Sequence, residues 1–311
     1  MVYYFKAIKM TANLIVILGA TASGKTRLAA RLAQELKSEI ISADSRQVYK
    51  GMNVGTGKDL EDYLLNGRSV PHHLIDIIGP EEEFSLFAFQ TEFYEIYAAL
   101  IQKKVLPVLV GGSGLYLESI IQNYQLPPAP LNHNFRNDLH TKSMDELREM
   151  LGVLKHQQHN KTDAEDKGRL IRAIEIERAR QKQPAGGARN ININAAIFGI
   201  RWERTLLRKR ITARLEQRLK QGMIEEVKAL QTNGLSWARL DSFGLEYRYI
   251  SQFLQHKVSY EEMFAKLNTS IHQFAKRQET WFRRMERKGI IINWINGDDY
   301  KLLKESVIKY L

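Results

Sequence analysis

The sequence predicts an α/β fold, in which a parallel β-sheet carries helices on both faces and a helical insertion separates two parts of this core. Two patterns predict it. Apolar, strand-like runs alternate with helix-like segments over about the first 120 residues, which is typical of a parallel sheet. From about Asn132 to Gln183, between a proline-rich break at 125–130 and a loop at 183–187, the chain is then polar and helix-prone and carries no strand pattern. We therefore expect a core of residues 1–122 and 191–311 and an insertion domain of residues 123–190.

The first expected strand, Leu14–Leu18, and the first expected helix, Arg27–Leu36, enclose a match to the pattern G-x-x-x-x-G-K-[ST]. In such a loop the glycines let backbone N–H groups point at a phosphate, the lysine adds positive charge, and the last hydroxyl binds Mg²⁺. A strand before it and a helix after it are the setting that this pattern requires. The core is thus expected to be P-loop NTPase-like, with Thr26 as the magnesium ligand. The P-loop consists of Gly19, Ala20, Thr21, Ala22, Ser23, Gly24, Lys25 and Thr26.

Three further strands are expected before the insertion, at 39–43, 72–78 and 105–110. Helices are expected at 85–104 and 114–121. Parallel α/β sheets bind their ligands beyond the carboxyl ends of the strands. Two polar groups, Asp44 and Ser113, follow such strand ends directly. We therefore expect both in one cleft with the P-loop.

Asp44 allows two interpretations from the residues alone. As a structural carboxylate it would hydrogen-bond the backbone of the turn that follows it. As a functional group it would bind Mg²⁺ through water or act as a general base on an acceptor. The pattern favours neither interpretation.

After the insertion we expect a strand within 191–202, mostly helices, and a last strand at 290–295 that completes the sheet. The helix expected at 260–288 is rich in Lys and Arg, which can pack their stems on apolar surface or contact a phosphate backbone. Helical spacing predicts that its core contacts are made by Phe274, Trp281 and Met285.

The helix expected at 204–222 carries two stripes of side chains at a spacing of four residues. The first is apolar and predicts the buried face, with Leu207, Ile211, Leu215 and Leu219. The second lies about 100° away on the flank of that face, with Arg210, Arg214 and Arg218. From this flank the arginines can reach into a cleft, and a plain solvated face is the alternative.

The composition is basic, with 46 Lys and Arg against 35 Asp and Glu, a formal charge of +11. Such an excess favours a polyanionic partner such as nucleic acid, and a basic enzyme without such a partner is the alternative. The lack of cysteine excludes disulfides, thiolate metal sites and cysteine nucleophiles. No apolar run approaches the roughly 20 residues that span a bilayer, and the N-terminal segment lacks a signal-peptide pattern. We therefore expect a cytoplasmic protein without membrane contact.

Six segments together resemble the tRNA dimethylallyltransferases, also called tRNA isopentenyltransferases. Two of them are far more specific than the P-loop alone, namely A-D-S-R-Q-V-Y-K-G-M at 43–52 and A-K-R-Q-E-T-W-F-R at 275–283. The resemblance spans about residues 12–290, nearly the whole chain. The remaining segments are the P-loop and residues 72–76, 111–117 and 169–175.

The resemblance implies transfer of a dimethylallyl group from dimethylallyl diphosphate to N6 of adenosine 37, next to the anticodon, in tRNAs that read codons beginning with U. The products would be N6-dimethylallyladenosine and diphosphate. The P-loop would then hold the leaving diphosphate with Mg²⁺ instead of cleaving a nucleotide. The implied partners are tRNA and dimethylallyl diphosphate, and we expect a monomer.

The resemblance also implies residue roles. Asp44 would be the general base for the N6 proton, and Ser113 would position the reacting groups. Lys25 and either Arg210 or Arg214 would hold the diphosphate. The target base must leave its stack, and its implied contacts, besides Asp44, are Ser45, Arg46 and Gln47. In the insertion, the anticodon stem-loop would be held by Gly168, Arg169, Leu170, Ile171 and Arg172.

Three other functions are compatible with parts of the sequence. An adenylate isopentenyltransferase would use the same donor with a free nucleotide as acceptor. A P-loop kinase would transfer phosphate from ATP to a small molecule. A non-enzymatic RNA-binding protein with a vestigial nucleotide site would bind RNA and form no product. The acceptor and the product distinguish all four.

Overall fold

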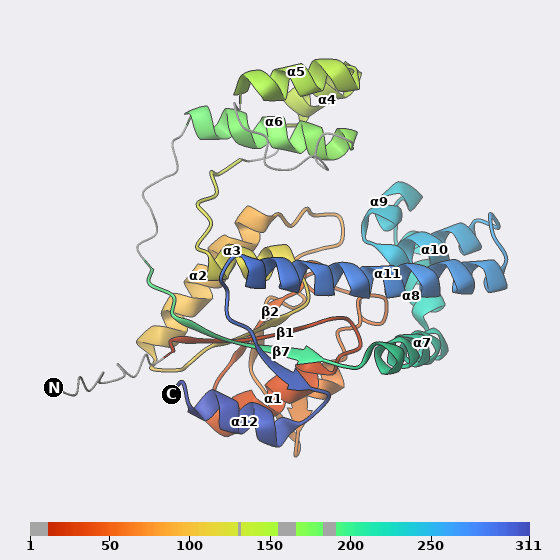
Figure 1. Cartoon of the computed structure of the whole chain (residues 1–311). Coiled ribbons are helices and arrows are strands. Elements are labelled where there is room, and N and C mark those ends of the chain that lie inside the picture. The colour runs from red at the N-terminus through yellow and green to blue at the C-terminus, as the bar shows by residue number, and fades with distance from the viewer. Residues whose placement is uncertain (1–11, 130–131, 155–165, 183–190) are drawn as a thin grey trace. The chain divides into compact units, whose positions relative to one another are not determined.

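The computed structural model describes residues 12–129, 132–154, 166–182 and 191–311 (Figure 1). The chain divides into two compact units. The larger unit comprises Met1–Asn123 and Ile193–Leu311, and the smaller unit comprises Tyr124–Asn192. Each unit is described separately below.

Six parallel strands form the sheet of the larger unit, in the order β5-β2-β6-β1-β7-β8. This confirms the predicted fold class. Because β1 pairs with β7, the segments before and after the insertion join in the middle of one sheet. The strands are β1 (Leu14–Gly19), β2 (Ile40–Ala43), β5 (His72–His73), β6 (Val108–Gly111), β7 (Ala195–Arg201) and β8 (Asn293–Asn296).

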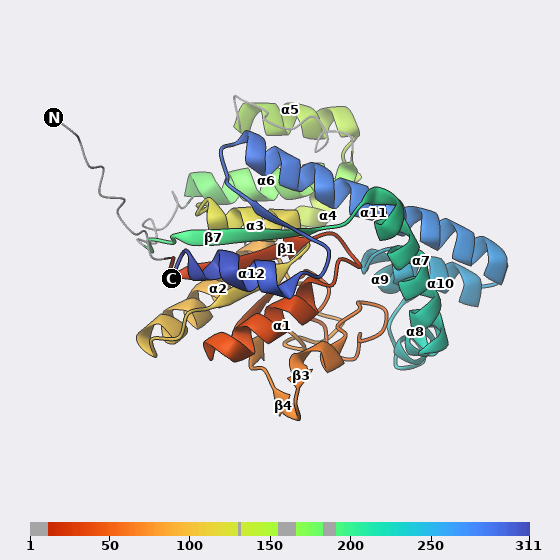
Figure 2. The same ribbon diagram turned by 60° about the horizontal axis from the view of Figure 1, so that its bottom comes forward.

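Helices cover both faces of this sheet, so β1 is buried along its whole length and its sequence is apolar rather than alternating. Figure 2 shows α1 and α12 on one face and α3 and α11 on the other. Side chains of α1 and α12 share one apolar core with β1 and β7. The bounds of the covering helices are α1 (Lys25–Leu36), α2 (Leu86–Gln102), α3 (Gly114–Ile121), α11 (Tyr260–Arg287) and α12 (Tyr300–Ile308).

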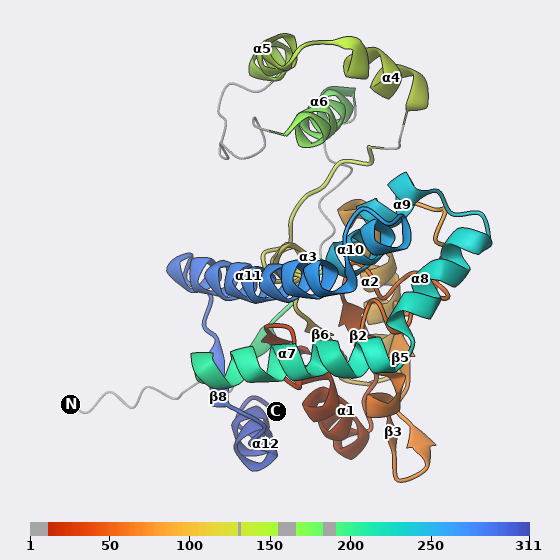
Figure 3. The same cartoon turned by 90° about the vertical axis from the view of Figure 1, so that its right-hand side faces the viewer.

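Four helices lead from β7 to α11: α7 (Arg204–Lys220), α8 (Met223–Thr232), α9 (Trp237–Ser242) and α10 (Leu245–Leu254). Figure 3 shows α7 beside α11, and the two helices contact each other. The apolar stripe of α7 is buried as predicted at Leu207, Ile211 and Leu215.

Two expectations need correction, and two elements were not predicted. The strand expected at 72–78 forms a strand only at its first two residues, and Ile78 makes an isolated parallel bridge with Tyr49. Between them, Leu74 and Asp76 adopt positive φ angles of 62° and 54° that end the extended conformation. Phe274 is 39% exposed, so the core face predicted for α11 is wrong at this residue. Met285 is buried as predicted, whereas Phe274 and Trp281 each precede a residue of the buried seam. This seam consists of Met263, Leu267, Ile271, Ala275, Gln278, Phe282 and Met285. The sequence also did not predict α12 or the antiparallel hairpin of β3 (Leu64–Leu65) and β4 (Arg68–Ser69).

The smaller unit is helical, as expected, in the residues that the structure describes. It contains α4 (His133–Thr141), α5 (Met144–Leu154) and α6 (Lys167–Lys182). These helices share a separate apolar core formed by Leu139, Leu147, Leu151, Leu170, Ile171 and Ile174. Across the described parts of both units, no helix has the length and apolar character needed to cross a membrane.

Candidate active site

The P-loop connects β1 to α1 and has the backbone of an anion-binding loop. Gly24 is the N-cap of α1 with φ 82°, a conformation that favours glycine. A Cβ atom on Gly19 would lie 2.9 Å from the Ile200 carbonyl oxygen, so this position admits only glycine. Because the N-cap residue is glycine, it brings no side chain to bond the first N–H groups of α1. Such an uncapped helix N-terminus is suited to binding an external anion.

Lys25 stands at the start of α1, and its Nζ donates to the Ala20 carbonyl at 3.5 Å. Burial lowers the pKa of Lys25 from 10.5 to about 8. The carboxylate of Asp44 opposes this shift, the guanidinium of Arg214 adds to it, and Asp59 opposes it. The lysine of the P-loop thus interacts electrostatically with the predicted base and with one of the predicted arginines.

Asp44 and Ser113 are brought together at the ends of β2 and β6. The Arg46 N–H donates to Asp44 Oδ1 at 2.9 Å, so Asp44 does stabilise the turn that follows it. The Ser45 N–H points to Ser113 Oγ at 3.4 Å, which joins the two strand ends. The carboxylate of Asp44 is half-buried and lies beside this hydroxyl-bearing loop. The structural role of Asp44 is thus visible in its bond to the Arg46 N–H, and its catalytic role stays a prediction.

Gln47, expected to contact the target adenine, is only 9% exposed. Its Oε1 accepts from Ser42 Oγ at 3.1 Å, and its Nε2 donates to the Gly57 carbonyl at 3.1 Å. Both ends of the amide are therefore used within the protein, and Gln47 fixes the loop at 51–58. Ser45 and Arg46 are partly exposed.

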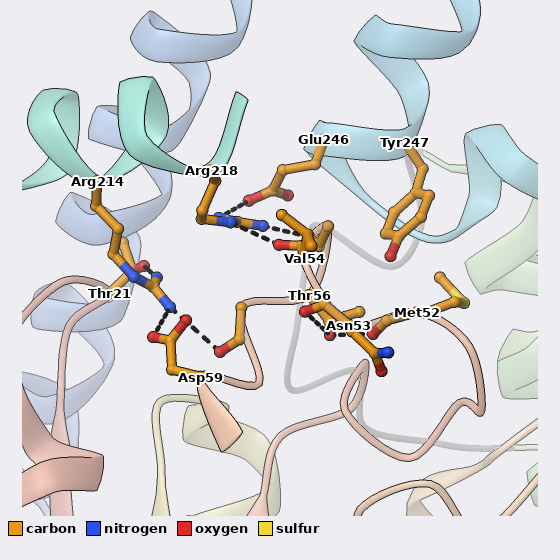
Figure 4. A network of polar contacts seen from close by, with 12 residues as sticks. Thr21, Met52, Asn53, Val54, Thr56, Asp59, Arg214, Arg218, Glu246 and Tyr247 are labelled. Atoms are coloured by element: carbon orange, nitrogen blue, oxygen red, sulfur yellow. Dashed lines mark hydrogen bonds and ion pairs between the residues drawn. The ribbon is translucent and has the colours of Figure 1, made fainter. Parts of the chain in front are cut away.

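Two arginines of the α7 stripe reach the P-loop. Arg210 Nε donates to the Ala22 carbonyl at 3.0 Å, and its guanidinium lies over the ring of Trp202 at 4.2 Å. Arg214 donates to Thr21 Oγ1 at 3.4 Å and to the Gly57 carbonyl at 3.2 Å, and it pairs with Asp59 (Figure 4). These contacts exclude a plain solvated face for both side chains, and a role in a ligand cleft stays a prediction.

Arg218, the third arginine of the stripe, has a different role. It is 5% exposed, donates to the carbonyls of Val54 and Gly55, and pairs with Glu246 on α10 at 3.0 Å (Figure 4). It therefore holds the loop at 51–58 rather than the P-loop.

The loop at 51–58 is fixed by a carboxylate that sequence reasoning missed. Glu226 on α8 accepts the N–H groups of Asn53, Val54 and Gly55 at 2.7, 2.7 and 2.8 Å, and also the hydroxyl of Tyr247 at 2.8 Å. The glycine-rich loop at 51–58 was the sequence feature that could have predicted such an acceptor, because converging backbone N–H groups need one.

Gln278 on α11 is the second residue that the sequence analysis did not single out, although it identified the motif that contains it. It lies within the motif at 275–283, is 7% exposed, and bonds both the P-loop and the loop that carries Ser113. No apolar periodicity predicts such a buried amide.

The insertion residues expected to contact tRNA fall into two groups. Gly168 and Arg169 are exposed in the first turn of α6. Leu170 and Ile171 are 0% and 1% exposed, because they form the core of the insertion, so their placement does not support direct contacts with RNA. Arg172 pairs with Glu175 and donates to the Ala129 carbonyl at 3.0 Å, and these contacts stabilise the unit itself.

The donor atoms present fit Mg²⁺ only together with a phosphate ligand. Among the described residues no group of three His, Cys, Asp or Glu could hold a metal ion. Thr26 is half-buried in the first turn of α1, next to Lys25. Mg²⁺ commonly takes one or two protein ligands and completes its shell with phosphate oxygens and water. A hydroxyl at Thr26 suits that mode of binding.

Comparisons with known proteins agree with this geometry. A family model described as IPP transferase matches residues 47–285, and one described as isopentenyl transferase matches residues 12–72. A tRNA dimethylallyltransferase 1 from Syntrophus aciditrophicus is 51% identical over 299 residues, which cover 96% of this chain and 98% of that protein. A tRNA dimethylallyltransferase 2 from Syntrophotalea carbinolica is 52% identical over 93% of this chain and 95% of that protein.

A solved structure is similar over the same extent. The full-length tRNA isopentenylpyrophosphate transferase of Bacillus halodurans superposes with a TM-score of 0.67 at 29% identity. The match covers 96% of this chain and 97% of that one. The similarity therefore includes both units.

Proposed function

Because the chain belongs to the tRNA dimethylallyltransferase family, we propose that it transfers the dimethylallyl group of dimethylallyl diphosphate to N6 of adenosine 37 in tRNA. The enzyme is a prenyltransferase. The observation that supports the assignment of its site is that the P-loop, Asp44 and Ser113 directly follow the carboxyl ends of the neighbouring strands β1, β2 and β6. This arrangement supports an anion-binding loop and a candidate base at one edge of the sheet.

In this proposal the P-loop and its arginines stabilise the leaving group. The allylic C–O bond breaks, and its electron pair goes to the diphosphate. The negative charge that develops there meets the N–H groups of the P-loop, Lys25, and the guanidinium groups of Arg210 and Arg214. Mg²⁺ bound with Thr26 would neutralise part of the same charge.

Asp44 removes the proton that the adenine amine must lose. Nitrogen N6 forms its bond to the allylic carbon while one N–H proton passes to the carboxylate of Asp44. Ser113 lies beside it through the contact with the Ser45 N–H and positions the reacting groups. The adenine of the tRNA reaches Asp44 by flipping out of its stack in the anticodon loop.

The tRNA is held by phosphate contacts from exposed basic residues. Arg169 of the insertion belongs to this set. On α11 it includes Lys276, Arg277, Arg283 and Arg287, whereas Arg284 and Lys288 pair with Glu118. Phosphate contacts make the affinity for tRNA fall with rising salt. We place this reaction in the cytoplasm and assign it to a monomer.

The direct test is incubation of the protein with unmodified tRNA, dimethylallyl diphosphate and Mg²⁺, followed by mass analysis of the nucleosides. We expect N6-dimethylallyladenosine in the tRNA and release of diphosphate. Parallel reactions with AMP as acceptor, and with ATP in place of the prenyl donor, test the adenylate isopentenyltransferase and the kinase. Failure to form the modified nucleoside in tRNA overturns the proposal.

A further inference from the structure

Gln278 connects the two loops that the proposed reaction brings together. Its Oε1 accepts the N–H of Thr21 in the P-loop at 2.8 Å. Its Nε2 donates to the carbonyl of Gly112 at 2.9 Å, one residue before Ser113. One side-chain amide therefore spans the space between the donor side and the acceptor side of the site.

The fit around this amide is close. A Cβ atom on Gly112 would lie 2.4 Å from Gln278 Nε2, so glycine is required opposite the amide. One turn further along α11, Trp281 lies against Gly114, where a Cβ atom would be 2.4 Å from its ring. The loop that carries Ser113 thus packs against α11 at both of its flanking glycines.

The helix that carries Gln278 is itself anchored to α3. Arg284 and Lys288 both pair with Glu118, whose side chain is fully buried. Since α3 begins directly after Ser113, this ion-paired cluster fixes α11 relative to the acceptor-side loop. Gln278 is therefore carried by a helix that is ion-paired to the element following the Ser113 loop.

We propose that Gln278 is a positioning residue, which sets the separation of the P-loop and the Ser113 loop so that the allylic carbon and N6 meet in reactive geometry. The proposal rests on the proposed function. It follows from the two hydrogen bonds of one buried amide, which join the loops beyond Leu18 and Gly111, where the pairing of β1 with β6 ends. Misplacement of reacting atoms by about 1 Å can cost about 100-fold in rate.

Two substitutions separate positioning from simple stabilisation. Gln278→Met keeps the length and loses both hydrogen bonds. Gln278→Glu keeps the acceptor for the Thr21 N–H but places a carboxylate oxygen against the Gly112 carbonyl, so it breaks the bridge at one end only. Gln273→Met, at an exposed position of the same helix, is the matched control.

The readout is the single-turnover rate of prenyl transfer with tRNA and dimethylallyl diphosphate both saturating, together with KM for each substrate and the melting temperature. We expect both Gln278 variants to react about 100-fold more slowly. For Gln278→Met we expect KM for tRNA within about threefold of the wild type, and for the control variant an unchanged rate.

A wild-type single-turnover rate in either variant that melts as a folded protein overturns the positioning role. A loss that appears only in KM, or loss of folding in both variants, assigns Gln278 to binding or stability and also overturns it. The wild-type reaction run in parallel tests the proposed function separately. Absence of product from the wild type refutes that function, whereas product formed equally by wild type and variants refutes the bridge alone.

Discussion

The P-loop and the loop at 51–58 are two glycine-rich segments that each contain a Gly-Lys pair, yet the structure uses them in opposite ways. In the loop at 51–58, Glu226 takes three consecutive N–H groups, and the lysine is buried at 1% exposure. That lysine, Lys58, donates to the Tyr49 carbonyl and to Asn53, and pairs with Asp76. In the P-loop, Lys25 makes one long bond to a carbonyl.

The difference lies in the source of the acceptor for the loop N–H groups, a carboxylate of the protein in the loop at 51–58 and, in our proposal, a phosphate ligand in the P-loop. The loop at 51–58 receives its carboxylate from α8 and becomes part of the scaffold. The P-loop receives none from its own N-cap, which leaves it for a phosphate ligand. Arg214 joins the two, since it donates to Thr21 in one and Gly57 in the other.

The largest expected effect concerns the chemistry beside the P-loop. Asp44→Asn keeps an oxygen that accepts the Arg46 N–H and removes the basicity, so the fold is preserved and the proton acceptor is lost. We expect the single-turnover rate of prenyl transfer to fall about 10²- to 10⁴-fold. The affinity for tRNA, measured by filter binding, should change little. A rate near that of the wild type would remove Asp44 from the role of base.

The next prediction tests whether the carboxylate of Glu226 stabilises the loop at 51–58. Glu226→Gln replaces one oxygen by an NH₂ group that opposes the backbone N–H groups it faces. We expect the free energy of unfolding to fall by about 2–4 kcal/mol in urea denaturation. Glu225→Gln, at the exposed neighbouring position, is the control and should change it by less than about 0.5 kcal/mol. Equal stability of the two variants would contradict the comparison of the loops.

The two lysines provide a matched pair. Lys25→Ala should weaken binding of inorganic pyrophosphate, measured by calorimetry, about 10- to 100-fold, because a charged contact to the anion is lost. Lys58→Ala should lower stability and leave the pyrophosphate affinity of the folded protein within about threefold. If Lys58→Ala weakened pyrophosphate binding as much as Lys25→Ala, the two loops would not differ as described.

The smallest expected effect is a pH dependence. With a pKa of about 8, Lys25 loses its proton as pH rises through that value. Pyrophosphate affinity should therefore fall above about pH 8, by at most about tenfold per pH unit, and Lys25→Arg should remove this part of the profile. The contribution of Lys25 to the free energy of unfolding changes with pH in the opposite direction. Between pH 8 and 10.5 the unfolded chain binds more protons at Lys25, so this group's contribution to stability rises with pH.

The parts of the molecule that the sequence predicted depend on local patterns. The P-loop, the strands β1 and β6, and the arginine stripe of α7 each follow from residues within a few positions of one another. Phe274 was assigned to the core because helical spacing alone does not fix the phase of a long helix in which apolar and basic residues are mixed.

The parts that it did not predict depend on distant partners. Glu226 bonds residues about 170 positions away, and Gln278 bonds Thr21 across 257 positions. A polar side chain that will be buried has the same appearance in the sequence as one that will be solvated. Leu170 and Ile171 show the related difficulty, since a segment shared by a family can be shared for packing as well as for contact with a substrate.

The insertion lies between α3 and β7 in the chain, and each unit has an apolar core of its own. A substitution inside one core therefore leaves the packing of the other unchanged. Lengthening an excursion between two fixed points costs only about 0.6 kcal/mol for each doubling. The smaller unit can therefore change in length and in surface residues during evolution while the strands of the larger unit are conserved in structure.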